Sequence, residues 1–336
     1  MNILLTGGAG FMGSHMVKHL LERYPTYRVV VYDKLTYAGN LDNLASVAAN
    51  PRYSFIRGDI GDAEAIARAI QEHRIEVIIN YAAETHVDRS IIDPAAFLRT
   101  DIFGVYTLLE AVKQFGLQKM VQISTDEVFG SIATGAFTEE SPFAPNSPYS
   151  ASKAGGDLLC RSYYVTFGTP VIVTHSCNFY GPYQYPEKFI PLFITNLLEG
   201  KKVPLYGDGQ NVREYIYPSD HCQAVDLVLH KGQGGAVYNI GTGEEKLNID
   251  VVQLLLEFLG RGPEMIEHVK DRPGHDRRYA IDAAKIRNEL GWRAQVTFVD
   301  GLRQTVQWYR ENESWWKKLK SGEYLEYYRR QYQTQN

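Results

Sequence analysis

Short apolar runs alternate along the first half of the chain with segments whose apolar residues recur every three or four positions. The runs are rich in β-branched residues and predict strands at 2–7, 28–33, 53–60, 77–83, 119–125 and 170–177. Helical spacing fits the segments 11–23, 62–73, 98–115 and 149–167. Strands that are apolar nearly throughout are buried on both faces. The alternation therefore predicts an α/β fold in which a doubly wound parallel sheet is covered by helices.

The pattern becomes less regular after about residue 178, where prolines and glycine-rich turns interrupt it. We therefore expect one domain over residues 1–177 and a smaller, less regular C-terminal lobe over 178–336. Segments near 212–241, notably the strand-like AVYNIG, are expected to return to the main sheet. The aromatic-rich tail is expected to pack as a terminal helix that includes Trp308, Trp315 and Trp316.

Composition and charge narrow the class of protein. The chain has 336 residues, of which 44% are hydrophobic and 22% charged, as in an ordinary globular protein of two domains. Its net charge of -4, with acids and bases interspersed, argues against a nucleic-acid binder. We expect no signal peptide, no membrane span and no metal site. Three distant cysteines without a pairing pattern favour the cytoplasm, and they are Cys160, Cys177 and Cys222.

Three glycines spaced three apart, Gly7, Gly10 and Gly13, stand where the first predicted strand leads into the first predicted helix. They could serve only a tight turn, or they could let a pyrophosphate approach the N-terminus of the helix. Asp33 ends the second strand, where a carboxylate can accept hydrogen bonds from ribose hydroxyls. Together they predict an NAD site. Lys34 leaves NADP open, because a 2′-phosphate would need a cation.

A second candidate site lies in SPFAPNSPYSASK (141–153), a loop that runs into a predicted helix. Tyr149 and Lys153 are four residues apart and so share one helical face. A phenol with its ordinary pKa of about 10 is a poor base at neutral pH. A nearby ammonium and a positively charged nicotinamide ring would favour the phenolate. Such a pair could instead be an exposed surface pair. The preceding strand that ends at Ser124 and Thr125 makes a catalytic site the better interpretation.

The motifs taken together are similar to those of the extended short-chain dehydrogenase/reductase family, which includes nucleotide-sugar epimerases and dehydratases. The resemblance is greatest to its dehydratases that act on dTDP-glucose. It covers nearly the whole chain through TGGAGFMGSH, YDKLTYAGN, GDI, AAETHVDRSI, STDEVFG, YSASK, NFYGPYQYPEKFIP and RPGHDRRYAID. It implies a Rossmann sheet that binds NAD and a C-terminal lobe that binds a nucleotide sugar.

The segment Thr125-Asp126-Glu127 distinguishes the activities of this family. An epimerase needs only the tyrosine and the cofactor, whereas loss of water across C5 and C6 also needs an acid and a base in different protonation states. The resemblance implies that Tyr149, helped by Lys153 and Thr125, takes the C4 hydroxyl proton while hydride passes to NAD. Glu127 then removes the C5 proton, Asp126 protonates the departing C6 hydroxyl, and hydride returns to C6. The product would be dTDP-4-keto-6-deoxyglucose.

The resemblance also implies which residues bind the ligands. Those along the cofactor are Gly7, Gly10, Phe11, Met12, Gly13, Asp33, Lys34, Asp59, Ile60, Ala82, Ala83, Thr100, Ser124, Tyr149 and Lys153. Those along the substrate are Glu84, Thr85 and Asn178, with Lys188, Arg213, Asn248, Arg272 and His275 at the diphosphate. An arginine fork matches phosphate oxygens. For each basic residue alone, a solvated surface charge is an equally good explanation.

Some residues depart from the family pattern. Phe129 replaces the usual tyrosine of TDEVYG, Phe179 the second asparagine of NNYGPY, and Asp101 and Val105 the asparagine and threonine of TNVxGT. None removes a predicted catalytic group. The alternatives are a 4,6-dehydratase of another nucleotide sugar such as UDP-glucose, a 4-epimerase or decarboxylase, and a sensor that only binds NAD(P).

The resemblance further implies a homodimer, because this family pairs the helix that starts near Tyr149 across a two-fold axis. That helix carries small and apolar residues, namely Ala151, Ala154, Leu158 and Leu159.

Overall fold

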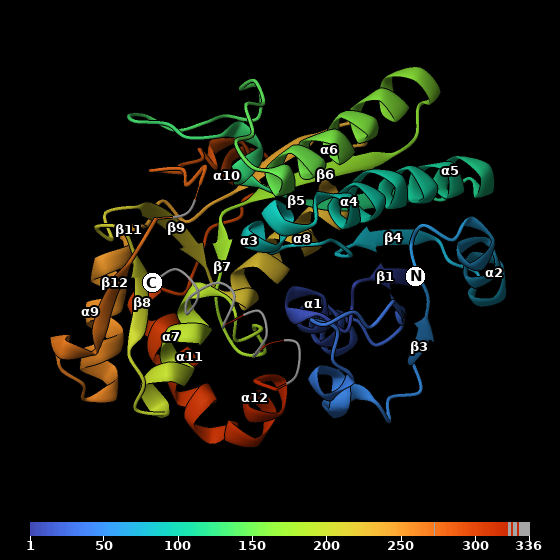
Figure 1. The fold of residues 1–336 in the computed structure, drawn as a ribbon. Helices are drawn as coiled ribbons and strands as arrows, with labels where there is room; N and C mark the ends of the chain where they lie inside the picture. The colour runs from blue at the N-terminus through green and yellow to red at the C-terminus, as the bar shows by residue number, and fades with distance from the viewer. Residues whose placement is uncertain (272, 322–323, 325–327, 329–336) are drawn as a thin grey trace.

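The computed structural model describes residues 1–271, 273–321, 324 and 328, and its centre is a seven-stranded sheet (Figure 1). The strands are β1 (Asn2–Thr6), β2 (Arg28–Asp33), β3 (Tyr53–Arg57), β4 (Val77–Asn80), β5 (Lys119–Thr125), β6 (Val171–Ser176), β7 (Asn178–Phe179), β8 (Val203–Tyr206), β9 (Val212–Ile216), β10 (Val237–Ile240), β11 (Glu245–Leu247) and β12 (Ile266–Val269).

The helices connect these strands and cover the sheet. They are α1 (Phe11–Arg23), α2 (Ala63–His73), α3 (Val87–Ile92), α4 (Pro94–Phe97), α5 (Val105–Phe115), α6 (Pro148–Phe167), α7 (Phe189–Leu198), α8 (Pro218–Lys231), α9 (Asn248–Leu259), α10 (Ala284–Leu290), α11 (Phe298–Glu311) and α12 (Glu313–Leu319). The described residues also form the 3-10 turns η1 (Leu41–Val47), η3 (Asp126–Phe129) and η4 (Pro263–Met265), and the π-helical η2 (Leu98–Gly104).

The large sheet has the order β10-β6-β5-β4-β1-β2-β3, and each of its ladders is parallel. The chain runs outward from β1 to β3 and then returns to place β4 on the other side of β1. In open sheets of this kind, ligands bind beyond the carboxyl ends of the strands where the order reverses. The predicted fold class is confirmed, and it directs attention to the loops after β1, β2, β4 and β5.

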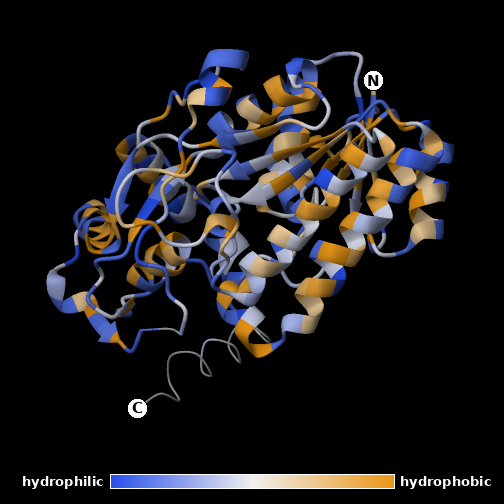
Figure 2. Ribbon diagram, turned by 90° about the horizontal axis from the view of Figure 1, so that it is seen from above, coloured by the Kyte–Doolittle hydropathy of each residue, from blue (hydrophilic) through white to orange (hydrophobic). Residues whose placement is uncertain are grey.

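Alternate residues of the strands face two separate cores. On one side Ile3 and Leu5 pack with α1 and α8, and on the other Leu4 packs with α2, α5 and α6. Figure 2 shows hydrophobic residues concentrated along the strands of the large sheet. Burial on both faces is what the nearly continuous apolar runs require.

The C-terminal lobe holds the small sheets β11-β9-β7 and β12-β8 and a third core beneath α7, α9 and α11. These helices gather on the opposite side of Figure 1 from β1 and β3. The tail forms the two helices α11 and α12, and the indole of Trp315 donates to Asn43 Oδ1 at 3.0 Å. This bond ties the lobe to η1 beside the large sheet. β10 pairs with β6 at the edge of the large sheet.

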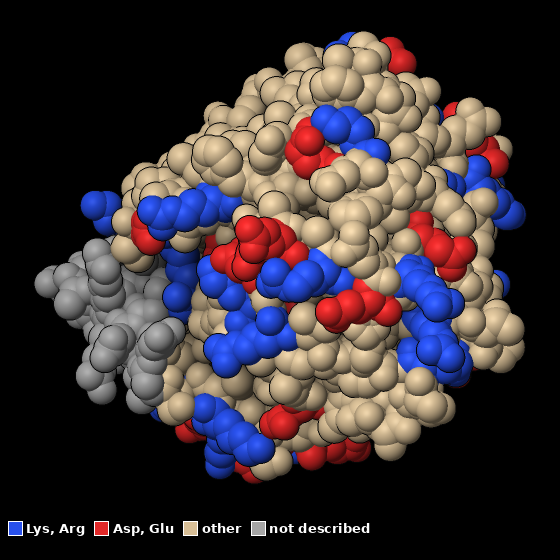
Figure 3. Space-filling model, turned by 90° about the vertical axis from the view of Figure 1, so that its right-hand side faces the viewer, with Lys and Arg blue, Asp and Glu red and all other residues tan. Residues whose placement is uncertain are grey.

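Basic and acidic side chains lie interspersed on the face drawn in Figure 3. Across the described residues, none of the helices combines the length and the apolar character that crossing a membrane would take. The three cysteines are buried and form no disulfide with one another.

Candidate active site

The turn between β1 and α1 is built of glycines for reasons of internal packing. Gly7 has φ +67°, and a Cβ there would lie 2.5 Å from the backbone nitrogen of Ala82. A Cβ on Gly13 would overlap the carbonyl oxygen of Gly7. Gly10 is less confined, since its nearest neighbour would be the Gly7 oxygen at 3.2 Å. Two of the three glycines therefore let the chain fold tightly, and the turn leaves the start of α1 open to a cleft.

Asp33 ends β2 at the edge of this cleft and is held by two backbone groups. Its Oδ2 accepts from the amide of Ala9 at 2.9 Å and its Oδ1 from the amide of Leu35 at 2.8 Å. Lys34 pairs with Asp59, with Nζ 2.6 Å from Oδ2. The cation that would have to neutralise a 2′-phosphate is thus already engaged, which favours NAD over NADP.

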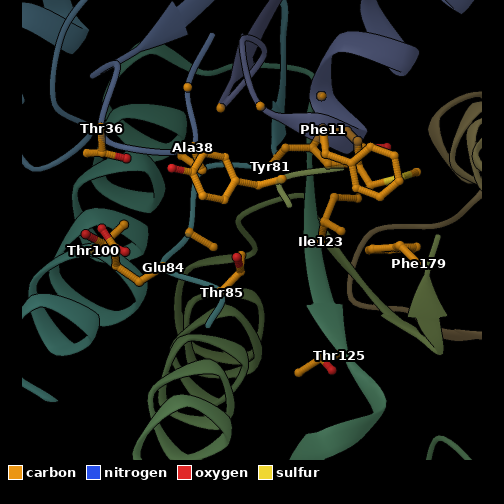
Figure 4. A pocket seen from close by; sticks show the side chains of 18 of the residues that line it. Phe11, Thr36, Ala38, Tyr81, Glu84, Thr85, Thr100, Ile123, Thr125 and Phe179 are labelled. Atoms are coloured by element: carbon orange, nitrogen blue, oxygen red, sulfur yellow. The ribbon is translucent and has the colours of Figure 1, made fainter. Parts of the chain in front are cut away.

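All fifteen residues predicted to contact the cofactor line a single cleft at the carboxyl edge of the sheet. They are Gly7, Gly10, Phe11, Met12, Gly13, Asp33, Lys34, Asp59, Ile60, Ala82, Ala83, Thr100, Ser124, Tyr149 and Lys153. In Figure 4, Tyr81, Glu84 and Thr85 lie on the segment after β4, while Ile123 and Thr125 lie on β5 itself. Asp33, at the end of β2, and Thr125, at the end of β5, both line this cleft.

The three residues at the end of β5 turn sharply into η3. The hydroxyl of Thr125 caps this turn by accepting from the amide of Glu127 at 3.2 Å, and it bonds Asp126 Oδ1 at 3.3 Å. Because the strand stops at Thr125, the two carboxylates are not forced onto opposite faces of the sheet. Glu127 lines the cleft, whereas Asp126 is not among the lining residues and has 2% of its surface exposed.

The two carboxyl groups have different surroundings. Burial raises the pKa of Asp126 well above its ordinary value, and the neighbouring carboxylates of Glu127 and Glu214 raise it further. Asp126 Oδ2 has no hydrogen-bond partner among the described residues. Glu127 Oε2 instead lies 3.4 Å from the hydroxyl of Tyr279. The arrangement suits a protonated Asp126 beside a Glu127 that is open to the cleft.

Tyr149 and Lys153 stand on the first turns of α6. Ser147 and Ser150 form a capping box and Pro148 occupies the first turn, which fixes where the helix begins. Lys153 Nζ donates to the carbonyl of Ile123 at 2.8 Å.

The predicted lowering of the Tyr149 pKa is not produced by the protein alone. Burial raises the pKa of the phenol well above its ordinary value, and the carboxylates of Glu127 and Asp101 add to the effect. A hydrogen bond with Thr125 acts in the opposite direction. A positive charge bound in the cleft is needed to bring the phenol into the useful range.

A second cavity continues the cleft into the C-terminal lobe. The two share the lining residues Thr85, Glu127, Asn178, Phe179, Gln184 and Lys188. The residues predicted to contact the substrate that line one or both cavities are Glu84, Thr85, Asn178, Lys188, Arg213, Asn248 and His275. Arg272 lies outside the described residues. The amide oxygens of Asn178 and Asn248 are buried without a partner among the described residues, as expected of groups that await a ligand.

Arg213 is held in place from two sides. Its Nη2 donates to the carbonyl of Asp276 at 2.9 Å, and its guanidinium carbon lies 4.2 Å above the centre of the Tyr279 ring. Lys188 Nζ donates to the carbonyl of Thr85. Both cations therefore face the second cavity from fixed positions, which suits an anionic group.

Sequence reasoning missed Tyr279. Its ring lies beneath Arg213, and its hydroxyl reaches Glu127 and also donates to Asp276 Oδ2 at 2.7 Å. It belongs to the motif RPGHDRRYAID, but the motif gave no sign that it would reach a residue 152 positions away. Phe179 was noted only as a departure and lines both cavities.

Comparison with known proteins identifies relatives of this chain. A family model described as GDP-mannose 4,6 dehydratase matches residues 4–305. A curated dTDP-glucose 4,6-dehydratase from Streptomyces niveus is 51% identical over 325 residues, which are 96% of this chain and 96% of that protein.

Two solved structures share the fold of this chain as well as its sequence. The dTDP-glucose 4,6-dehydratase of Bacillus anthracis, in complex with NAD, is 53% identical with a TM-score of 0.90 and covers 95% of this chain and 99% of its own. That of Streptomyces venezuelae, with NAD among its bound ligands, is 52% identical with a TM-score of 0.93 and covers 95% of this chain and 100% of its own.

Proposed function

This chain belongs to the extended short-chain dehydrogenase/reductase family, and from that premise we propose how its cleft dehydrates a nucleotide sugar. The reaction is the conversion of dTDP-glucose to dTDP-4-keto-6-deoxyglucose, the activity after which its relatives at about half identity are named. The observation that carries the proposal is the buried Asp126, with its raised pKa, next to Glu127 at the end of β5.

The cofactor is NAD, as in the related structures that contain it. The open start of α1 suits its pyrophosphate and Asp33 its adenosine ribose. NAD supplies a reversible hydride acceptor, so that a single bound molecule serves both the oxidation of C4 and the reduction of C6.

In the first step Tyr149 takes the proton of the C4 hydroxyl. Its phenol is buried and bonded to Thr125, and Lys153 is fixed on the next turn of α6 by the carbonyl of Ile123. We assign Lys153 the role of stabilising the phenolate, and Thr125 that of orienting it.

In the second step the two carboxyl groups remove water. The ketone at C4 makes the C5 proton acidic, and Glu127 takes it from the side of the cleft that it lines. Asp126, which burial keeps protonated, gives its proton to the departing C6 hydroxyl. Two carboxyl groups kept in different protonation states are what the elimination requires.

The nucleotide diphosphate occupies the second cavity in this proposal. Arg213 and Lys188 face it from fixed positions, and Asn248 and His275 also line it. Arg272 keeps the diphosphate role that its motif predicts. In this proposal residues 1–177 form the domain that binds the cofactor, and residues 178–336 form the lobe that mainly binds the substrate.

We further propose that the protein works in the cytoplasm. Cys160, Cys177 and Cys222 are buried as free thiols, and burial raises the pKa of each. Such thiols suit a reducing compartment.

The proposed reaction is tested by following hydrogen atoms. The protein, without added NAD, is incubated with dTDP-glucose carrying deuterium at C4, and the product is examined by mass spectrometry and proton NMR. We expect the loss of one water, deuterium at C6 of the same molecule, and incorporation of solvent deuterium at C5 in heavy water. UDP-glucose in a parallel reaction is expected to be a poorer substrate. Deuterium kept at C4 with no loss of water would refute the dehydratase function.

A homodimer formed through α5 and α6 is also part of the proposal. Most of the large hydrophobic side chains exposed among the described residues lie on η2, α5 and α6, including Phe103 at 63%, Leu158 at 57% and Val165 at 65%. Figure 1 shows α5 and α6 side by side. Ala154, by contrast, is buried against the sheet and does not belong to this surface. An apolar surface of this kind is typical of an interface between subunits.

Light scattering at micromolar concentration is expected to give the mass of a dimer. Val165→Glu, which would place a charge in the interface, is expected to give the mass of a monomer. Val299→Glu is the matched control, since Val299 is an exposed valine on α11 at 36%. A wild-type monomer, or equal masses for the two variants, would argue against this interface.

A further inference from the structure

Asp101 is a buried carboxyl group close to the catalytic residues that the mechanism above does not use. It lies in the π-helical stretch η2 with 1% of its surface exposed. Helix α6 packs directly on this stretch, because a Cβ on Gly156 would lie 2.5 Å from the carbonyl oxygen of Asp101. The side chain is therefore held in a fixed position relative to Tyr149 and Lys153, which stand on the same helix.

The hydrogen bonds around Asp101 are best satisfied when it carries a proton. Ser152 Oγ lies 2.8 Å from Asp101 Oδ2 and also 2.8 Å from the carbonyl oxygen of Tyr149. A hydroxyl has one proton and cannot donate fully to both. If the carboxyl donates to Ser152, the serine can donate to Tyr149 and both bonds are made. The other oxygen, Oδ1, accepts from the amide of Glu84 at 3.2 Å in either state.

The charges that face Asp101 come from two sides. Helix α6 contributes Lys153 and Tyr149, and the segment after β4 contributes Glu84. Helix α4 and the first turn of α5, which also pack on η2, carry no charged side chain. Lys153 is thus the single cation among these groups. Its charge lowers the pKa of Asp101, whereas an ionised Asp101 raises the pKa of Tyr149.

On the basis of the proposed function, we propose that Asp101 is a positioning residue which must be protonated while Tyr149 accepts the substrate proton. In the neutral form it leaves the charge of Lys153 to the phenolate. In the ionised form it adds a negative charge near Tyr149 and opposes phenolate formation. Asp101 thereby sets the upper pH at which the oxidation step is efficient.

The pKa of Asp101 places this change near neutral pH. Burial raises the pKa from 3.8 to about 7, with Lys153 and the bond from Ser152 limiting the rise. The folded group therefore holds its proton below about pH 7 and loses it above. Above that pH, the ionised carboxyl raises the pKa of Tyr149 and offsets the gain that a more alkaline solution would bring.

The variant Asp101→Asn tests this inference, because an amide has nearly the same shape and can donate to Ser152 but cannot ionise. The rate of reduction of enzyme-bound NAD is measured by absorbance after rapid mixing with dTDP-glucose, at pH values from about 5.5 to about 9.5. We expect rates within about twofold of wild type at the acid end and a rate about fivefold or more above wild type at the alkaline end. A purely structural role would change the rate equally at every pH.

Asp220→Asn is the matched control. Asp220 lies at the start of α8, is also 1% exposed and has a pKa raised by burial. Unlike Asp101, it accepts hydrogen bonds from the backbone amides of Gln295 and Val296. Its replacement is expected to leave the shape of the pH profile unchanged. Superimposable profiles for Asp101→Asn and wild type, with product still formed, would overturn the inference and leave the proposed function intact.

A second measurement does not depend on activity or on the folding of a variant. Carbon-13 NMR of the wild-type holoenzyme, labelled at its aspartate carboxyl carbons, is expected to show a resonance that titrates near pH 7 and is missing from Asp101→Asn. Absence of any such resonance in the wild type would overturn the inference. If NAD is not reduced by either protein at any pH, the proposed function fails, and this titration still decides whether Asp101 holds a proton at neutral pH.

Discussion

Replacement of Tyr149 by phenylalanine is expected to slow the oxidation of C4 by about a hundredfold to ten-thousandfold, the usual contribution of a positioned acid–base group. The phenol is the group assigned to take the C4 hydroxyl proton, and it lines the same cleft as Lys153 and Thr125. The ring of Tyr149 packs edge-on against that of Phe97, with the two ring centres 6.2 Å apart. Phenylalanine keeps this ring, so the packing is preserved. The change is read as reduced-cofactor absorbance after rapid mixing with dTDP-glucose.

Tyr163→Phe provides the matched control for this variant. Tyr163 lies on the same helix, is similarly buried, and bonds Glu110 rather than any group of the cleft. We expect its activity to remain within about twofold of wild type. If Tyr149→Phe retained the wild-type rate of cofactor reduction, another group would have to be the base.

The large sheet was predictable because each strand is specified by local apolar runs. The residues at which the strands end were harder to predict. The apolar run after β4 continues to Ala83, but the ladder with β1 ends where Thr6 pairs with Asn80. Likewise β3 stops at Arg57, which pairs with Asp33 at the end of β2. In these two cases the strand ends where the neighbouring strand also ends, and that partner is not visible in the run itself.

The C-terminal lobe was harder to predict because its strands are too short to show a period. β7 has two residues and β11 has three. β8 pairs with β12, some sixty positions further along the chain, through contacts such as Val203 with Ile266. Such pairing depends on the tertiary packing of the lobe rather than on local pattern.

In the candidate site, too, local features could be predicted from the sequence and contacts across the fold could not. Residues in contiguous motifs, such as Thr125 to Glu127 or Tyr149 to Lys153, could be predicted as groups because short spacing fixes their relative position. Tyr279 and Asp101 were not given a role, because their significance lies in contacts across the fold, with Glu127 and Ser152 respectively. The pKa of Tyr149 could not be foreseen either, since it depends on burial that the sequence does not reveal.

Replacement of Glu127 by glutamine is expected to separate oxidation from elimination. The amide keeps the shape of the side chain and can still accept from Tyr279, but it cannot remove the C5 proton. The oxidation of C4 should therefore proceed while loss of water slows by about a hundredfold to ten-thousandfold. Reduced cofactor is expected to accumulate on the enzyme after mixing with dTDP-glucose. The double variant with Tyr149→Phe should show no accumulation, because oxidation comes first.

Asp126→Asn distinguishes the acid from the base, since it too should block loss of water but for a different reason. With Asp126 replaced, Glu127 can still take the C5 proton and return one from solvent, whereas the C6 hydroxyl has no proton donor to help it leave. In heavy water the bound sugar is therefore expected to gain deuterium at C5 in Asp126→Asn and to gain almost none in Glu127→Gln. Quenched samples read by mass spectrometry give this comparison directly. Equal exchange in the two variants would mean that the roles of acid and base are not divided between the buried Asp126 and the cleft-facing Glu127.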